Sequence, residues 1–312
     1  MRPVNGTLDR CERLYQQEIA PRVAALPGAA ERLAAGLVGE GSECFGFDDE
    51  VSRDHDWGPA VCLWLRPQDQ AALAEPLEAL LASLPASFED VPLRRPGPEA
   101  AGRSGVLEIG AFYRRFTGLE RPPASFEEWL AIPEHALAAC TNGRVFTDPC
   151  GAFTRHREQL LAHYPEPVRR LKLAACLAAA AQAGQYNLPR CLRRRDPVAA
   201  SLAQAAFLRH AMGAAFLLAR RYRPFYKWMH RALVELPEPG PSLAAGLLDL
   251  TQAGDPRARM DGVEAIAVLL VQALGQAGLT ASRDTFLLAH ARELRHNLRD
   301  ARLLAMNPGL DG

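Results

Sequence analysis

The sequence predicts an α+β protein in which a small mixed sheet with helices is followed by an all-helical domain. Over the first 120 residues, short apolar runs bounded by turn residues alternate with helical patterns, as in a unit built on a sheet. Beyond Pro122 the strand signals nearly vanish and apolar residues recur at helical spacing. The 312 residues are enough for two domains with separate cores. We therefore expect one domain at 1–120 and a helical domain at 121–312.

The first domain holds the strand candidates. A helical stretch is expected over 8–35, broken near Pro27-Gly28, and a second helix over 68–84, where leucines recur at helical spacing. Short apolar lengths with turn residues at their ends predict strands, and these fall at 59–65, 87–93 and 105–113.

Helix-start residues support the second domain. Ser125 precedes two glutamates, Asp196 precedes a proline, and Asp284 precedes an apolar run; each is a residue type that accepts hydrogen bonds from the first turn of a helix. The expected helices cover 125–139, 152–163, 166–183, 196–220, 222–235, 241–252, 260–277 and 283–304.

Composition excludes several classes of protein. The absence of an apolar run of membrane-spanning length argues against a membrane protein, and the polar N-terminus does not resemble a signal peptide. Lys plus Arg equals Asp plus Glu, at 36 each, so bulk charge makes nucleic acid an unlikely partner. The seven cysteines are widely spaced without a C-x-x-C pair, which disfavours a zinc site or a disulfide framework and fits a reducing cytoplasm.

The segment from Gly41 to Gly58 carries the chemistry. Asp54 and Asp56 are two residues apart ahead of an apolar run, and on a strand such a pair faces one side. Two adjacent carboxylates repel one another unless a cation lies between them, and Mg²⁺ prefers oxygen ligands. Gly41-Ser42 precedes the pair by a short interval and offers amides that a phosphate can approach. A solvated acidic loop is the alternative interpretation.

The pattern resembles a known superfamily. Gly-Ser followed after eleven residues by Asp-x-Asp is similar to the signature of the nucleotidyltransferase fold, which includes polymerase β and the aminoglycoside nucleotidyltransferases. The string from Gly39 to Gly58 resembles the DUF4037 family more closely, as do the blocks FYRRFTG (112–118), AGQYNLPR (183–190) and RRYRPFYKWMHRAL (220–233). The resemblance covers most of the chain and implies a nucleotidyltransferase domain followed by a helical domain. It names no substrate.

A third carboxylate on a neighbouring strand belongs to the superfamily pattern. Glu108, an acid within an apolar run, is our candidate. The resemblance thus implies catalytic and metal-ligating roles for Asp54, Asp56 and Glu108, with two Mg²⁺ ions during turnover. The alternative for Glu108 is a charged residue at a strand edge.

The helical domain supplies candidate nucleotide-binding residues. Tyr226 and Lys227 combine an aromatic ring and a cation in one helical turn, as suits a base and a phosphate. Asn187 offers an amide that can recognise a base or cap a helix. With Gly41 and Ser42 they complete the predicted nucleotide site. The alternative is a helix whose cations are merely solvated.

These observations predict an enzyme that transfers a nucleoside monophosphate from a nucleoside triphosphate to a hydroxyl of a small molecule. A second hypothesis keeps the chemistry but makes the acceptor a protein or an RNA. A third is a non-catalytic nucleotide-binding or interaction protein with the same fold. The sequence selects neither the acceptor nor the preferred base.

Overall fold

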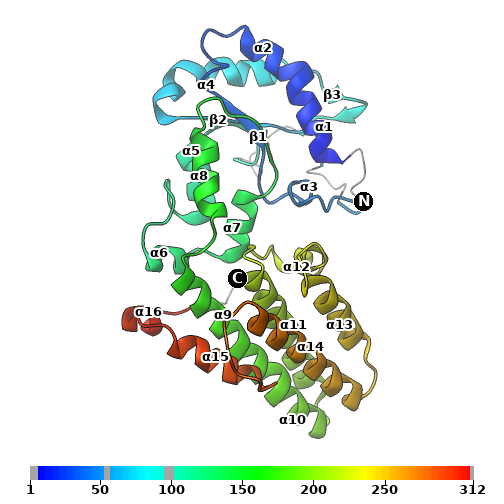
Figure 1. The fold of residues 1–312 in the computed structure, drawn as a ribbon. Coiled ribbons are helices and arrows are strands. Elements are labelled where there is room, and N and C mark those ends of the chain that lie inside the picture. Colours follow the sequence, from blue (N-terminus) through cyan, green and yellow to red (C-terminus); the bar gives the residue numbers. More distant parts are fainter. Residues whose placement is uncertain (1–5, 53–56, 95–101, 310–312) are drawn as a thin grey trace. The chain divides into compact units, whose positions relative to one another are not determined.

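The computed structural model describes residues 6–52, 57–94 and 102–309, and it confirms the predicted α+β class. The chain divides into two compact units. Unit 1 comprises 1–123 and 136–162, and unit 2 comprises 124–135 and 163–312. All strands of the described residues lie in unit 1. The described residues of unit 2 form helices and loops (Figure 1).

Unit 1 contains a four-stranded mixed sheet in the order β5-β2-β1-β6. Strand β1 is antiparallel to both β2 and β6, and β2 is parallel to β5. The C-terminal end of β1 therefore lies beside the N-terminal ends of β2 and β5. We call this side of the sheet the Gly41 edge, because the chain leaves β1 there toward Gly41. The strands are β1 (Ala34–Leu37), β2 (Cys62–Leu65), β5 (Gly105–Glu108) and β6 (Arg144–Thr147).

Strand alternation places different side chains of β2 on the two faces of the sheet. Leu63 and Leu65 pack into a core with residues of the N-terminal helices and α4 (Pro67–Ala82). Trp64 points to the other face, where its ring stacks on Phe153 at 3.8 Å and meets Phe112 edge-on. Figure 1 shows α4 on one side of the strands and α5 and α8 on the other. The remaining helices named are α1 (Thr7–Leu14), π-helix η1 (Tyr15–Ile19), α2 (Ala20–Ala24), α5 (Ile109–Thr117) and α8 (Ala152–Leu161).

Three expectations are corrected in unit 1. The strand expected over 105–113 ends at Glu108, because Phe112 and Phe116 belong to one buried face of α5. The end of the helix expected over 8–35 is strand β1, which pairs on both sides. The run 87–93 is a short hairpin of β3 (Ser87–Phe88) and β4 (Val91–Pro92). Strand β6 was not anticipated, and its position beside β1 assigns 136–162 to unit 1.

Unit 2 is a set of packed helices organised around α9, which lies against α11 and α15. The predicted starts at Ser125 and Asp196 are confirmed, since each side chain accepts a hydrogen bond from the first turn of its helix. No helix within the described residues is both long and apolar enough for a membrane crossing. The helices are α6 (Phe126–Ala131), α9 (Glu166–Ala180), π-helix η3 (Ala181–Asn187), α10 (Leu188–Arg193), α11 (Pro197–Leu218), α12 (Tyr226–Val234), α13 (Gly240–Gln252), α14 (Pro256–Gln276), α15 (Leu287–His296) and α16 (Ala301–Ala305); α7 (Glu134–Thr141) lies across the division between the units.

Candidate functional site

The Gly41-Ser42 turn lies between the end of β1 and the short helix α3 (Ser42–Phe45). Gly41 is the N-cap residue of α3, in an extended conformation. Among the described residues, the backbone amides of Ser42 and Glu43 donate to no acceptor, and the Ser42 hydroxyl has no partner. Unpaired amides of this kind suit an oxyanion ligand. The turn therefore has the donors that a phosphate group requires.

Asn142 and Gly143 hold this turn in place from a segment 100 residues further along the chain. The Asn142 side chain accepts from the Gly39 amide at 3.0 Å and donates to the Gly39 carbonyl at 2.7 Å. The Gly143 amide donates to the Cys44 carbonyl at 2.8 Å. A side chain at Gly143 would lie 2.0 Å from the Leu37 carbonyl oxygen, and its φ of +63° favours glycine. These contacts fix the path of the chain out of β1.

Glu43 and Arg94 form a buried ion pair beside the turn. The Arg94 Nη1 donates to Glu43 Oε1 at 2.8 Å, and both side chains are largely shielded from solvent. The Glu43 carboxyl group folds back over Gly41, so that a Cβ at this position would lie 2.3 Å from both carboxylate oxygens. The packing of the Glu43 carboxylate thus favours glycine at position 41.

Two further arginines surround Glu40. The Arg115 Nη2 lies 2.7 Å from Glu40 Oε2, and the Arg103 Nε lies 3.5 Å from the same oxygen. Arg115 also donates to the Gly102 carbonyl. Together with the Glu43–Arg94 pair, these contacts place three guanidinium groups and two carboxylates along the Gly41 edge. Guanidinium groups are suitable donors to phosphate oxygens.

Arg94, Arg103 and Asn142 are not among the residues predicted from the sequence. The two arginines belong to an Arg-rich loop between the strand candidates, and Asn142 belongs to the turn Thr141-Asn142-Gly143. Both patterns could have drawn attention to these residues. Neither pattern reveals which turn its residues contact, because their partners are 51 to 103 residues away.

Glu108 is the last residue of β5 and the N-cap of α5. Its side chain accepts a hydrogen bond from the Gly110 amide at 3.1 Å. In the parallel ladder Glu108 pairs with Leu65, at the C-terminal end of β2, whereas Gly36 pairs with Cys62 at the N-terminal end. Since each strand residue advances the chain by about 3.3 Å, Glu108 lies at the side of the sheet opposite the Gly41 edge. The observed role of its carboxylate is helix capping.

Asp54 and Asp56, the predicted metal ligands, lie outside the described residues. Within the described ranges no group of three or more His, Cys, Asp or Glu side chains is arranged to hold a metal ion. The chain enters β2 at the Gly41 edge. Their roles, like that of Glu108 in metal binding, remain predictions.

The predicted nucleotide-binding residues of the second domain lie on two helical segments of unit 2. Tyr226 and Lys227 begin α12 and are exposed, Tyr226 to 70%. The Lys227 ammonium lies 5.3 Å from the centre of the Trp228 ring. Asn187 ends π-helix η3, where its side chain accepts from Gln182 at 3.5 Å. The exposure of Tyr226 and Lys227 leaves them available to a ligand.

The neighbouring residues of η3 have structural roles. The Gln185 side chain contacts Glu264, the Thr285 carbonyl and the Leu287 amide, each at 2.9 Å. Gly184 allows the close approach of Phe207, whose ring would lie 2.3 Å from a Cβ there. The block at 183–190 therefore serves packing and helix connection in large part.

Comparison with known proteins identifies one family model. Residues 129–229 match the model described as Domain of unknown function (DUF4037), which confirms the resemblance in this segment. The matched residues include Asn187, Tyr226 and Lys227, while Gly41 and Glu108 precede them. No curated protein and no solved structure matches the chain.

Proposed function

We propose that this chain, which carries a DUF4037 domain, is an Mg²⁺-dependent nucleotidyltransferase that acts on a hydroxyl of a small molecule. In this reaction the acceptor oxygen forms a bond to the α-phosphorus of a nucleoside triphosphate. The bond from that phosphorus to the bridging oxygen breaks, pyrophosphate leaves, and the hydroxyl proton passes to solvent.

The observation that supports this proposal is the Gly41-Ser42 turn, whose amides have no acceptor in the described part of the chain, at the edge where the chain enters β2. The amides of Ser42 and Glu43 and the Ser42 hydroxyl would hold phosphate oxygens. Arg94, Arg103 and Arg115 surround this turn through their contacts with Glu40 and Glu43, and their charge would favour the anion. The backbone supplies orientation, and the arginines supply electrostatic stabilisation.

The contacts of the other carboxylates support our choice of Mg²⁺ ligands. Glu40 and Glu43 are engaged in ion pairs with arginines, and Glu108 caps α5. Asp54 and Asp56 are therefore the metal ligands in our proposal, with phosphate oxygens and water completing the set. The ion would neutralise the triphosphate and align the reacting groups.

A pyrophosphate-release assay across the common nucleoside triphosphates and a library of hydroxyl-bearing metabolites tests the proposal. We expect release that depends on Mg²⁺, and its loss in the Asp54→Asn and Asp56→Asn variants. The matched control is Glu50→Gln, which removes one negative charge from the same acidic segment at an exposed position. Full activity in both aspartate variants would contradict the proposal.

Two further measurements separate the alternatives. Radiolabel from ATP on protein or RNA in a cell extract would identify a macromolecular acceptor. Nucleotide binding without Mg²⁺ dependence and without turnover would identify a non-catalytic binding protein. We place the reaction in a reducing compartment such as the cytoplasm, a proposal supported by seven cysteines that are all free thiols.

A further inference from the structure

The lining of a cavity in unit 2 contains none of the residues of the proposed nucleotide chemistry. The cavity has a volume of about 320 Å³ and is formed where the end of α10 and the start of α11 meet the start of α14. Volumes of this size are at the lower end of those found for small-molecule sites. Its walls combine apolar surface from Leu192, Pro197, Ala200 and Pro256 with two arginines.

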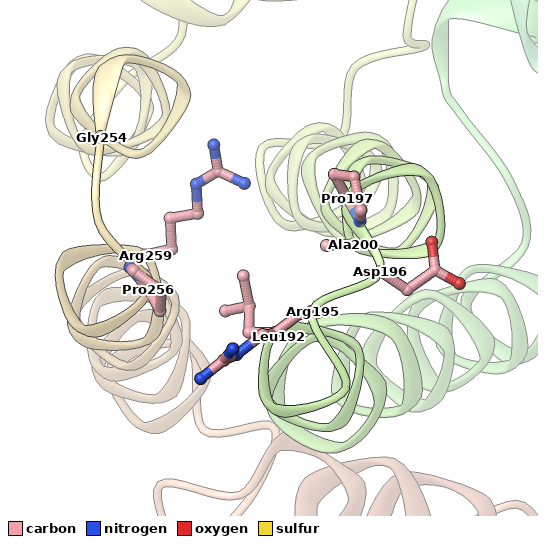
Figure 2. A pocket seen from close by; sticks show the side chains of 8 residues that line it. All are labelled: Leu192, Arg195, Asp196, Pro197, Ala200, Gly254, Pro256 and Arg259. Carbon is pink, nitrogen blue, oxygen red and sulfur yellow. The ribbon is translucent and has the colours of Figure 1, made fainter.

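Arg195 and Arg259 bring two positive charges to this cavity. Among the described residues, neither guanidinium pairs with a carboxylate. The Arg259 Nε donates to the Ala253 carbonyl at 3.1 Å, which leaves its two terminal nitrogens without a protein acceptor there. Figure 2 shows the Arg259 and Leu192 side chains projecting into the space between the helices, with Arg195 extending toward Pro256.

The acidic residue of the lining does not neutralise this charge. The Asp196 side chain caps α11 by accepting from the Ala199 amide at 3.0 Å. In Figure 2 its carboxylate points away from the cavity. Among its described lining residues, the cavity therefore presents cations and apolar surface, with the one carboxylate directed away from it.

The backbone at Arg195 is also informative. This residue follows the end of α10 with a φ of +56°, and the Arg195 amide donates to the Leu192 carbonyl. Glycine is the usual residue at such a left-handed helix end, because a Cβ is strained there. An arginine at this position keeps a guanidinium at the cavity despite that strain.

We propose that this cavity binds a phosphate monoester whose apolar group lies against Leu192 and Pro256. A phosphate monoester carries a charge between −1.5 and −2 at neutral pH, which the positive charges of Arg195 and Arg259 would balance. The planar guanidinium of either arginine can donate two parallel hydrogen bonds to phosphate oxygens. The apolar walls would contact the organic part of the ligand. This site is independent of the proposed nucleotidyl transfer.

Calorimetric titration of the full chain with phenyl phosphate tests the proposal. We expect one site, with tighter binding of phenyl phosphate than of inorganic phosphate, which lacks the apolar group, or of benzoate, which carries one charge. Arg195→Gln and Arg259→Gln should each weaken binding about tenfold or more, as loss of a charge-assisted hydrogen bond does. Arg194→Gln is the matched control, since Arg194 is an exposed neighbour outside the lining.

Three outcomes would overturn the proposal. One is the absence of heat at about 10 mM phenyl phosphate, a concentration that nearly saturates a millimolar site. Another is equal affinity of the Arg195→Gln and Arg194→Gln proteins. The third is loss of binding in Ser42→Ala with retention in Arg195→Gln, which would assign the ligand to the Gly41-Ser42 turn. Arg195 makes no side-chain hydrogen bond with the described residues, so its variant serves even if Arg259→Gln unfolds.

Discussion

The Glu43 carboxylate accepts a hydrogen bond at 2.8 Å from Arg94, a residue 51 positions away along the chain, and covers the Cα of Gly41. This contact joins the predicted phosphate turn to a loop that the sequence leaves unassigned. Because both side chains are buried, the pair is a structural element of the site as well as a source of charge.

Removal of one member of this pair should be strongly destabilising. Arg94→Met leaves the Glu43 carboxylate buried without its guanidinium partner, and we expect a loss of about 3–5 kcal/mol in the free energy of unfolding. Urea denaturation measures the change. The control is Glu120→Gln, which breaks the exposed Arg114–Glu120 pair and should cost about 0–1 kcal/mol. Equal losses in the two variants would contradict the structure.

Gly41→Ala should disturb the same contact. An added Cβ would lie 2.3 Å from the Glu43 carboxylate oxygens, so the acid must move away from Arg94, at a cost of about 1–3 kcal/mol. Gly275→Ala in α14 is the matched control, because nothing lies within 4 Å of its added Cβ and alanine favours a helix. We expect the melting temperature to fall for Gly41→Ala and to rise or stay constant for Gly275→Ala. The opposite order would be inconsistent with this packing.

Glu108→Gln separates helix capping from metal binding. As an N-cap, Glu108 contributes one hydrogen bond to α5. Because glutamine keeps an oxygen that can accept this bond, the replacement should cost less than about 1 kcal/mol of stability with nucleotidyl transfer retained. A metal ligand would instead show the loss of turnover expected for Asp54→Asn. Transfer kinetics and urea denaturation of the same variant distinguish the two roles. Loss of activity in a protein of normal stability would show that Glu108 acts as a metal ligand.

The cysteines should differ sharply in reactivity. Burial raises the pKa of the thiols of Cys11, Cys62 and Cys140 to about 12, and the thiolate is the reactive form. Cys150 and Cys191 are partly exposed. Brief maleimide treatment of the native protein followed by mass spectrometry should label these two, and labelling in denaturant should reach all seven cysteines. Labelling of Cys11 at the rate of Cys150 would argue against its burial.

His156 should make the stability of the protein sensitive to pH. Burial against Tyr113, whose ring is stacked at 3.6 Å, lowers the pKa of His156 from 6.5 to about 4. Between these values the unfolded chain binds the proton and the folded chain does not, so this contribution to stability is full above about pH 6.5 and is lost as the pH falls toward 4.

The corresponding test is His156→Phe, which keeps an aromatic ring but removes the titration. We expect the unfolding free energy of the variant to fall less between pH 6.5 and pH 4 than that of the parent protein, by about 1–3 kcal/mol. Urea denaturation at several pH values gives both curves. Parallel curves over this interval would show that His156 does not titrate as the structure requires.

The sequence by itself determined the local features of this protein. Ser125 and Asp196 start their helices as expected because a cap forms between residues three positions apart. The buried strand β2 and the all-helical nature of unit 2 follow from apolar spacing along neighbouring residues. The DUF4037 resemblance was likewise legible in contiguous blocks, and the family model matches part of them.

Only the tertiary structure decided how distant segments meet. β6 is a strand because it pairs with β1 over more than a hundred residues, and its own sequence carries a weak signal. Glu108 lies in a strand as expected, but the turn of the chain into α5 also makes its side chain a helix cap. The Glu43–Arg94 ion pair and the two hydrogen bonds between Asn142 and Gly39 form only when segments far apart in the chain come together. Local sequence patterns do not specify such contacts, because each of these side chains could pair with many other residues of the chain.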